Sequence, residues 1–204
     1  MSHVTEPIVF RAATVLVLLA FVVHRAYYTR KYPPPESETV DKLKPGLVTR
    51  LSSALSVLAL IATAIYVVAP ARIAWASLPL PTWLRAVGLV LAGAGFALLE
   101  WSHRSLGREW SDQPRLTQSQ RLVEGGPYRW IRHPIYASFL LILGSTLLLS
   151  ANWLVGLAWI MSVGLEVEAR IGFEEDRMAS HFGDDYRAYA ARTGRLFPRL
   201  RRPA

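Results

Sequence analysis

Long apolar segments alternate with compact charged groups along this chain, and that alternation constrains the fold more than any other feature. The apolar segments cover residues 8–23, 51–69, 83–99, 135–149 and 153–167. A soluble domain would mix charged and apolar residues at the period of a helix or a strand, whereas an integral membrane protein keeps them apart. The sequence therefore predicts an all-α integral membrane protein with five transmembrane helices.

The last two apolar segments are short, and the polar sequence Ser150-Ala151-Asn152 separates them. A single helix through residues 135–167 would have about 33 residues and a length of roughly 50 Å, too long for a hydrocarbon core of ~30 Å. We therefore interpret the polar break as a tight turn. These two segments are expected to form a helical hairpin in the membrane.

Basic residues are distributed unequally between the two sides that five helices would define. Residues 25–50 and 102–132 each contain six Lys and Arg and residues 170–204 contain eight, whereas the other side receives only Arg11, Arg72 and Arg85. The positive-inside rule then places the N-terminus outside and the C-terminus in the cytoplasm, with the bacterial inner membrane as the expected location. The first apolar segment has no basic region before it and no cleavage site after it, so we expect a retained helix.

The chain contains no cysteine and has a net charge of +8, and both facts bear on the kinds of site that it can form. Without cysteine there are no disulfides, no thiolate nucleophiles and no Cys-based metal sites. The positive charge does not indicate nucleic-acid binding, because the basic residues lie at the membrane ends without interleaved aromatic side chains. We expect membrane lipid as a partner and no nucleic acid, and the sequence leaves the oligomeric state open.

The polar motif Arg132-His133-Pro134 precedes the fourth apolar segment. Proline disfavours the α conformation in the preceding residue and suits the first position of a helix, so we expect the fourth helix to begin at Pro134. Arg132 and His133 would then lie at a helix N-terminus, where free N–H groups and the helix dipole favour an anion. The alternative is structural, with Arg132 as an anchor at the membrane surface and His133 as a helix cap.

A second polar motif follows the fifth apolar segment. Glu166, Arg170 and Glu174 are four residues apart and share one face of a helix that leaves the membrane. A carboxylate at the edge of the hydrocarbon is costly and usually faces a cavity or a partner, although an ordinary surface salt-bridge ladder is the alternative. This face is therefore a candidate wall of a polar site.

Beyond that face the sequence indicates a helix stop and a second short helix. Gly183 is typical of a helix end, Asp184 is typical of a cap, and residues 185–192 would form the short helix. Tyr186 and Tyr189 on this helix either fold back over the polar motifs or anchor the helix at the membrane interface.

The connector over residues 102–128 is long and polar, and it ends in a Gly125-Gly126-Pro127 turn. A connection of this length, with Gln113, Gln120 and Arg121, is typical of a cytoplasmic lid. It contains no glycine-rich phosphate-binding pattern, and the chain offers no close His, Asp and Glu cluster for a metal and no Ser-His-Asp constellation.

Taken together, these motifs resemble the isoprenylcysteine carboxyl methyltransferase family of integral membrane enzymes. The resemblance runs from about Ser105 to Pro198, nearly half the chain, and depends on the order and spacing of three pieces. They are Leu122-Val123-x-x-Gly126-x-Tyr128, Arg132-His133-Pro134-x-Tyr136, and a tail with Glu174-Glu175, Phe182-Gly183, Tyr186, Tyr189, Arg195 and Pro198.

The resemblance implies a cytoplasmic site for S-adenosylmethionine and no metal. Residues 1–101 would form a three-span membrane region, and residues 102–204 a cofactor-binding and catalytic region that includes the hairpin. Arg170 would face the carboxylate of the substrate, and Glu174 would share in catalysis. The implied cofactor contacts, with Arg132 added from its place at the helix N-terminus, are Gln113, Gln120, Arg121, Leu122, Val123, Tyr128, Arg132, His133, Pro134, Ile135, Tyr136 and Glu174.

The function implied is methyl transfer to an amphipathic or lipid-like substrate that enters from the bilayer, with a carboxylate or a thiol as the favoured acceptor. A phospholipid N-methyltransferase would use the same cofactor with an amine acceptor. An NADPH-dependent membrane sterol or steroid reductase shares the Arg-His-Pro-x-Tyr motif and the tyrosine-rich tail, although such chains usually have more than five spans. A scaffold without enzymatic activity is the remaining alternative.

Overall fold

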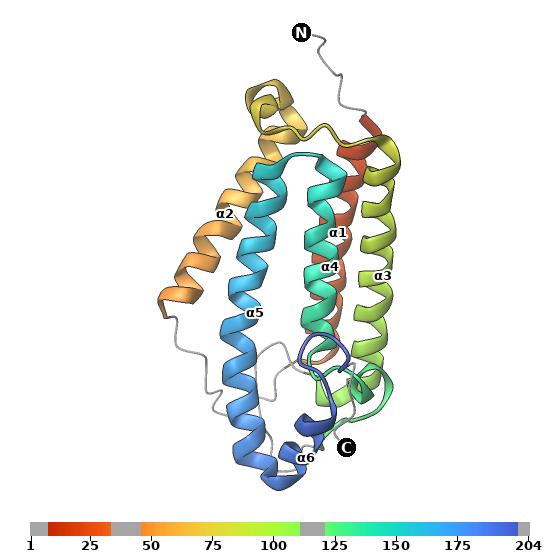
Figure 1. Ribbon diagram of the computed structural model, residues 1–204, viewed down its shortest axis with the longest axis vertical. Coiled ribbons are helices and arrows are strands. Elements are labelled where there is room, and N and C mark those ends of the chain that lie inside the picture. Colours follow the sequence, from red (N-terminus) through yellow and green to blue (C-terminus); the bar gives the residue numbers. More distant parts are fainter. Residues whose placement is uncertain (1–7, 34–45, 111–120, 200–204) are drawn as a thin grey trace.

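The computed structural model describes residues 8–33, 46–110 and 121–199. Within these ranges the secondary structure is helical, apart from two isolated β-bridges, so the predicted all-α fold is confirmed. The α-helices are α1 (Ile8–Lys31), α2 (Leu47–Val68), α3 (Thr82–Leu106), α4 (Pro134–Ser150), α5 (Trp153–Phe182) and α6 (Asp184–Arg192) (Figure 1). Three short 3-10 helices are η1 (Pro70–Ala76), η2 (Gly107–Glu109) and η3 (Gly126–Arg129).

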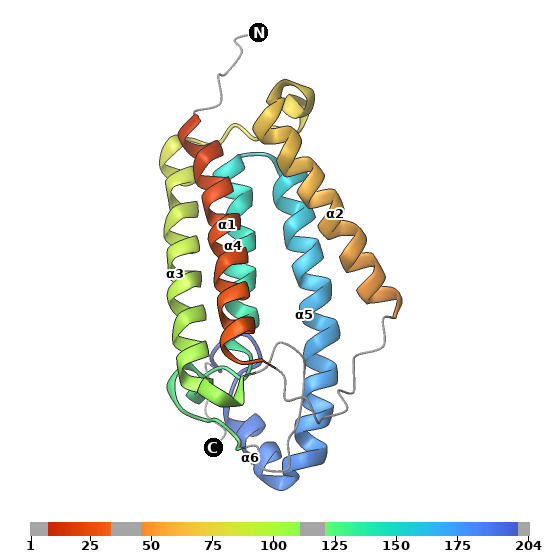
Figure 2. The same cartoon turned by 180° about the vertical axis from the view of Figure 1, so that it is seen from behind.

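The five long helices lie along the long axis of the molecule (Figures 1 and 2). α3 packs along α4, α2 packs along α5, and α4 and α5 contact each other, while α1 packs on α4 and α3. The central apolar cluster includes Leu99 of α3, Ile142 of α4 and Ile171 of α5, all fully buried. The α4–α5 turn lies at the same end as the start of α1, and α6 lies at the opposite end.

Three segments of the described residues are long and apolar enough to cross a membrane: Ile8–Lys31, Leu47–Val68 and Thr82–Glu109. α4 is apolar but has only 17 residues, and the apolar part of α5 ends at Val167, before a charged second half. These helices are those of a multi-pass integral membrane protein. The count of five spans and the sidedness of the termini stay predictions.

The predicted helical hairpin is confirmed at the α4–α5 turn. Ala151 adopts a left-handed conformation with φ of 47°, which ends α4. The side chain of Asn152 caps α5 by accepting a hydrogen bond from the backbone N–H of Val155 at 3.2 Å, and its amide donates to the carbonyl of Ile73 at 3.0 Å. Arg85 of α3 donates two hydrogen bonds to the carbonyl of Leu149, so this carbonyl near the end of α4 is not left unsatisfied in an apolar environment.

The C-terminal part of the chain returns to the start of α4. α5 ends at Phe182, Gly183 has φ of 56°, and α6 follows at once, so the stop predicted at Gly183 is confirmed. Asp184 is the first residue of α6 rather than its cap, because Gly183 occupies the cap position. After α6, Gly194 pairs with the motif before α4 and accepts a hydrogen bond from the backbone N–H of Arg132 at 2.8 Å.

The close approach of α3 and α4 depends on a glycine. A Cβ at Gly95 would lie 2.6 Å from a side-chain carbon of Ile142 and 3.2 Å from its backbone nitrogen, whereas a Cβ at Gly93 would have no atom within 4 Å. We expect Gly95→Ala to lower the free energy of unfolding in detergent by about 1–3 kcal/mol through overpacking. Gly93→Ala on the same helix is the control, and equal effects in the two variants would contradict this account of helix packing.

Candidate functional site

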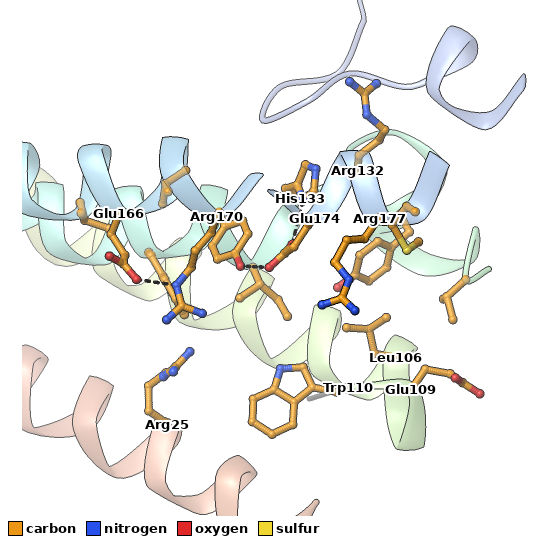
Figure 3. Close-up of a pocket in the computed structure, with 18 of the residues that line it drawn as sticks. Arg25, Leu106, Glu109, Trp110, Arg132, His133, Glu166, Arg170, Glu174 and Arg177 are labelled. Atoms are coloured by element: carbon orange, nitrogen blue, oxygen red, sulfur yellow. Dashed lines mark hydrogen bonds and ion pairs between the residues drawn. The ribbon is translucent and has the colours of Figure 1, made fainter. Parts of the chain in front are cut away.

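A cavity of about 510 Å³ opens between the helices toward the α6 end of the molecule (Figure 3). Its volume is in the range of small-molecule sites. One part, which we name the inner chamber, is lined mostly by polar and aromatic residues: Trp110, Arg121, Leu122, Val123, Tyr128, His133, Tyr136, Glu174, Arg177, Met178, Tyr186 and Tyr189. The other part, the membrane limb, lies between α1, α2, α4 and α5 and is lined by Phe21, Arg25, Ser52, Ser53, Ser56, Phe139, Leu143, Trp159, Ser162, Val163 and Glu166.

His133 lies between two carboxylates of α5. Its Nε2 is 3.2 Å from Glu175 and its Nδ1 is 3.6 Å from Glu174, and the ring is 8% exposed. Burial lowers the pKa of His133, but hydrogen bonds and charge interactions with Glu174 and Glu175 outweigh it, so the pKa lies above its ordinary value. His133 occupies the cap position of α4, as the structural alternative predicted, but its side chain makes no hydrogen bond to the first turn of the helix and bonds to α5 instead.

Arg132 points away from the centre of the cavity, toward α6 (Figure 3). Its guanidinium bonds to Glu175 at 2.9 Å and donates to the carbonyls of Ala190 at 3.0 Å and Thr193 at 2.6 Å. The side chain is only 11% exposed, so Arg132 is not an anchor at the membrane surface. It links α5 and α6 through these hydrogen bonds. A direct contact of Arg132 with a cofactor stays a prediction.

Glu175 is where the basic side chains of this region converge. Arg132, His133 and Arg195 all bond to its carboxylate, the last at 3.1 Å. Burial raises the pKa of Glu175, but the hydrogen bonds from His133 and Arg132 dominate and lower it to about 2. The sequence offered Glu175 only as part of a motif, and nothing in the local pattern distinguished its role from that of Glu174.

Glu174 is the carboxylate that faces the inner chamber (Figure 3). The hydroxyl of Tyr136 donates a hydrogen bond to it, and the rings of Tyr136 and His133 stack with centroids 5.8 Å apart. Tyr136 lies in the first turn of α4, so the start of α4 and the middle of α5 form a single polar wall. The sequence placed these three residues in one site, and the structure brings them together.

α6 folds back over the inner chamber, which settles the two alternatives for its tyrosines. Tyr186 and Tyr189 are buried, and the hydroxyl of Tyr189 donates to the carbonyl of Tyr128 at 2.8 Å. Burial raises the pKa of Tyr186 to about 12 and raises those of Tyr128 and Tyr189 above their ordinary values. These phenols are therefore protonated at neutral pH and can act as hydrogen-bond donors but not as general bases.

Arg170 and Glu166 lie where the inner chamber meets the membrane limb. Arg170 Nε is 2.5 Å from Glu166, so the predicted ladder is present between these two residues, and both line the cavity rather than a free surface. In Figure 3 Arg25 of α1 extends toward the same pair from the opposite side. Arg25 was not predicted as a site residue, because on sequence alone it is one of many basic residues at a membrane end.

A row of serines continues from Glu166 along the contact between α2 and α5. Ser52 donates to the carbonyl of Ser162 at 3.0 Å and lies 3.4 Å from Glu166, and the hydroxyls of Ser56 and Ser162 are 2.6 Å apart. Such short polar side chains allow close helix packing in a membrane and satisfy one another. They form one wall of the membrane limb, and Phe21 of α1 lies on its apolar side.

Most of the predicted site residues therefore line one cavity: Arg121, Leu122, Val123, Tyr128, Arg132, His133, Ile135, Tyr136, Arg170 and Glu174. Pro134 is buried as the first residue of α4 and does not line it. Gln113 and Gln120 lie outside the described residues. Within the described ranges no group of three or more His, Asp or Glu side chains could hold a metal ion.

The sequence comparisons agree with the motifs. A model of the "Isoprenylcysteine carboxyl methyltransferase (ICMT) family" matches residues 86–180. The protein-S-isoprenylcysteine O-methyltransferase of Mus musculus is 28% identical over 123 residues, which cover 59% of this chain and 44% of that protein. The enzyme of the same name from Schizosaccharomyces pombe is 30% identical over 107 residues, or 52% of this chain and 40% of that protein. The matched region spans less than half of each relative.

The fold comparison extends further along the chain. A solved structure described as the eukaryotic intramembrane Ras methyltransferase ICMT covers 96% of this chain, with a TM-score of 0.66, 19% identity and 69% of its own chain covered. At this identity the likeness concerns the fold alone. The resemblance indicated by the motifs is confirmed: the chain is related to the isoprenylcysteine carboxyl methyltransferase family in sequence over residues 86–180 and in fold over almost its whole length.

Proposed function

We propose that this protein is a membrane-embedded, S-adenosylmethionine-dependent methyltransferase that acts on an amphipathic substrate with an anionic acceptor, in the manner of an isoprenylcysteine carboxyl methyltransferase. One observation carries the proposal. A single cavity joins an inner chamber with a polar wall of Glu174, Tyr136 and His133 to a limb between membrane helices, and Arg170 lies at their junction.

The groups in the inner chamber fit the cofactor chemically. S-Adenosylmethionine carries an ammonium, a sulfonium, a carboxylate and an adenine, and it supplies an activated methyl group when bound. Glu174 offers a carboxylate for the ammonium, and Arg121 and Arg177 offer guanidinium groups for the carboxylate. The rings of Trp110 and Tyr136 suit the adenine and the positively charged sulfur.

On the acceptor side the protein has to orient and desolvate rather than transfer protons. Arg170, held by Glu166, presents a planar cation to the polar end of a substrate that arrives along the membrane limb. A carboxylate or thiolate acceptor needs no general base, which agrees with the protonated tyrosines of the chamber. Holding donor and acceptor in line can contribute roughly 7–11 kcal/mol to lowering the barrier.

The proposal also includes the orientation of the protein across the membrane. We place the N-terminus outside and the inner chamber with α6 on the cytoplasmic side, because twenty of twenty-three basic residues then lie inside. Five spans, a bacterial inner membrane and a functional division near residues 101–102 belong to this proposal. That division falls inside α3, which continues to Leu106, so it separates roles along the chain rather than separate folding units.

The proposal is tested by equilibrium binding of S-adenosylmethionine and of NADPH to the purified protein, followed by transfer of a labelled methyl group. We expect binding of S-adenosylmethionine and transfer to N-acetyl-S-farnesylcysteine, a small prenylcysteine acid. Transfer to phosphatidylethanolamine instead would indicate a phospholipid N-methyltransferase. Binding of NADPH with no binding of S-adenosylmethionine would indicate a reductase and reject the proposal.

Arg170→Lys gives a sharper test of the acceptor side, because it keeps the charge and removes the planar fork. We expect the turnover number to fall by about tenfold or more, the loss of one charge-assisted hydrogen bond, with little change in the affinity for S-adenosylmethionine. Arg187→Lys is the control, since Arg187 pairs with Asp184 on the surface of α6 and does not line the cavity. A fall in cofactor affinity at unchanged turnover would assign Arg170 to the cofactor instead.

A further inference from the structure

We propose that Tyr28 of α1 and His103 of α3 are positioning residues for the cofactor site, which act by holding the ring of Trp110 in the wall of the inner chamber. This inference rests on the proposed function and adds α1 to that site. α1 lies outside the family match, which begins at residue 86. It also lies outside residues 102–204, the region that the resemblance assigned to cofactor binding.

Trp110 lines the cavity although its backbone belongs to no helix. It follows η2 in an extended conformation, with φ of −75° and ψ of 135°, and its backbone N–H donates a long hydrogen bond of 3.4 Å to the carbonyl of Gly107. In Figure 3 its ring lies across the cavity from Glu174. Because this backbone restricts the ring little, the side chains packed against Trp110 determine its orientation.

Three rings pack against Trp110: those of Tyr28 on α1, Tyr32 just after α1 and His103 on α3. In that order, their centroids lie 6.0, 6.2 and 5.1 Å from that of Trp110, at interplanar angles of 70°, 58° and 56°. Tyr28 and His103 also stack on each other, with centroids 4.0 Å apart and an interplanar angle of 29°. Stacked and edge-to-face arrangements are the favourable geometries of aromatic pairs. The ring of Trp110 therefore packs across a stacked pair of rings from two helices.

Hydrogen bonds fix the orientation of this stacked pair. Nδ1 of His103 donates to the carbonyl of Leu99 at 2.9 Å, since a carbonyl can only accept. The hydroxyl of Tyr28 donates to Glu100 at 3.1 Å, and Nε2 of His24 lies 3.1 Å from the same carboxylate oxygen. Tyr28 and His103 are both almost completely buried. Each ring is thus held by packing on its faces and by a hydrogen bond at its edge.

The composition of this cluster is costly if its role is packing alone. Nε2 of His103 and Nδ1 of His24 are buried without a hydrogen-bond partner in the described part of the chain. Such atoms lower stability, and a phenylalanine in place of His103 would fill similar space without this cost. What histidine adds is a ring whose plane is fixed by the bond to Leu99. A fixed plane is useful where a neighbouring ring has to be held in one orientation.

A fixed Trp110 ring favours binding because the ligand does not have to order it. A ring that is already held in place presents a flat face to the planar adenine of S-adenosylmethionine at a lower entropic cost than a mobile one. Glu174, the proposed partner of the ammonium group, lies on the opposite side of the cavity (Figure 3). Loss of a ring that supports Trp110 should therefore weaken binding of the cofactor.

The first measurement follows Trp110 itself in the full-length protein in detergent, with fluorotryptophan incorporated in place of tryptophan and no ligand present. The fluorine resonance that is missing in Trp110→Leu belongs to Trp110. We expect this resonance to be single and narrow in the native protein and to broaden or split in Tyr28→Leu, because the ring loses its single orientation. Tyr27→Leu is the matched control, since Tyr27 is the neighbouring residue on α1, is 54% exposed and does not line the cavity.

The second measurement is the affinity for S-adenosylmethionine. In Tyr28→Leu we expect it to fall about threefold to tenfold, the range that one aromatic pair contributes. It should also fall in Trp110→Leu, and adding Tyr28→Leu to that variant should change it no further, because Tyr28 acts through Trp110. His103→Phe keeps a ring of similar size and loses the bond to Leu99, and it should have the same effect as Tyr28→Leu.

A narrow Trp110 resonance in Tyr28→Leu, or native affinity despite a broadened one, would overturn the inference. A further fall in affinity when Tyr28→Leu is added to Trp110→Leu would also overturn it, since Tyr28 would then act on the fold as a whole. If Tyr28→Leu does not fold, His103→Phe decides, because it also removes the unpartnered Nε2: a broadened resonance supports the inference, and a narrow one rejects it. Broadening in a protein whose native form binds no S-adenosylmethionine would support the positioning of Trp110 while rejecting the proposed function.

Discussion

Glu175→Gln is expected to lower the free energy of unfolding by about 3 kcal/mol, the largest effect on stability of any single substitution in the site. The glutamine keeps the shape of the side chain but removes the charge that Arg132, His133 and Arg195 share. Removing one partner of a buried ion pair leaves an uncompensated charge, which costs about 3–5 kcal/mol. We place the effect at the lower end because the Glu175 side chain is 21% exposed.

The pH dependence of stability gives this prediction a second readout. The pKa of Glu175 in the folded protein is about 2, below its ordinary 4.5, so its contribution is fully present above about pH 4.5 and is lost as the pH falls toward 2. The pKa of His133 is raised above 6.5, so its contribution is fully present below about pH 6.5 and is lost as the pH rises through the raised value. In Glu175→Gln, both the loss of stability toward low pH and the loss of stability as the pH rises should become smaller.

Glu168→Gln is the matched control for this experiment. Glu168 is on the same helix, its side chain is 70% exposed, and it pairs with Arg195 at 3.5 Å, so its removal should change stability little. Unfolding of the native protein and both variants would be followed in detergent between pH 3 and pH 8. Similar stability of the two variants, or an unchanged acid slope in Glu175→Gln, would contradict the assignment of Glu175 as the shared partner.

The parts of the fold that could be predicted from sequence are those with strong local signals. Proline at the start of α4, glycine at the end of α5 and the polar turn between α4 and α5 each restrict the backbone of one or two residues, and each was found where expected. The extent of α5 could be predicted as well. The spacing of Glu166, Arg170 and Glu174 predicted a helix that leaves the membrane, and α5 continues through these residues to Phe182.

The sequence did not show which residue each polar side chain contacts in the folded protein. Ser52 and Ser162 are 110 residues apart, and Arg25 reaches the cavity only because α1 packs against α4. Arg132 had the same local pattern as a surface anchor, and its burial depends on α6 returning to cover it. Contacts of this kind depend on the packing of distant helices, which no local pattern encodes.

The adjacent carboxylates Glu174 and Glu175 show this limit most clearly. Neighbouring residues on a helix are rotated by about 100° from each other, so they face different surroundings, but the sequence does not say which of them faces the cavity. In the structure Glu174 faces the inner chamber with Tyr136, and Glu175 bonds to Arg132. We therefore expect substitutions at these two positions to have separate consequences.

Glu174→Gln is expected to weaken binding of S-adenosylmethionine by roughly tenfold to a hundredfold, with little loss of stability. In the proposed site the substitution would remove a charge-assisted contact to the ammonium group, which is worth about 1.5–3 kcal/mol. The amide oxygen can still accept the hydrogen bond from Tyr136, and the cations near His133 keep Glu175 as their partner. Isothermal titration with S-adenosylmethionine and thermal unfolding in detergent would be measured on the same preparations.

The pairing of these measurements separates a binding role from a structural one. Glu175→Gln should lower stability strongly, and the protein that remains folded should bind S-adenosylmethionine with nearly native affinity, because that carboxylate bonds to Arg132, His133 and Arg195 rather than to a ligand. Glu174→Gln should show the reverse. Native affinity in Glu174→Gln would remove Glu174 from the cofactor site.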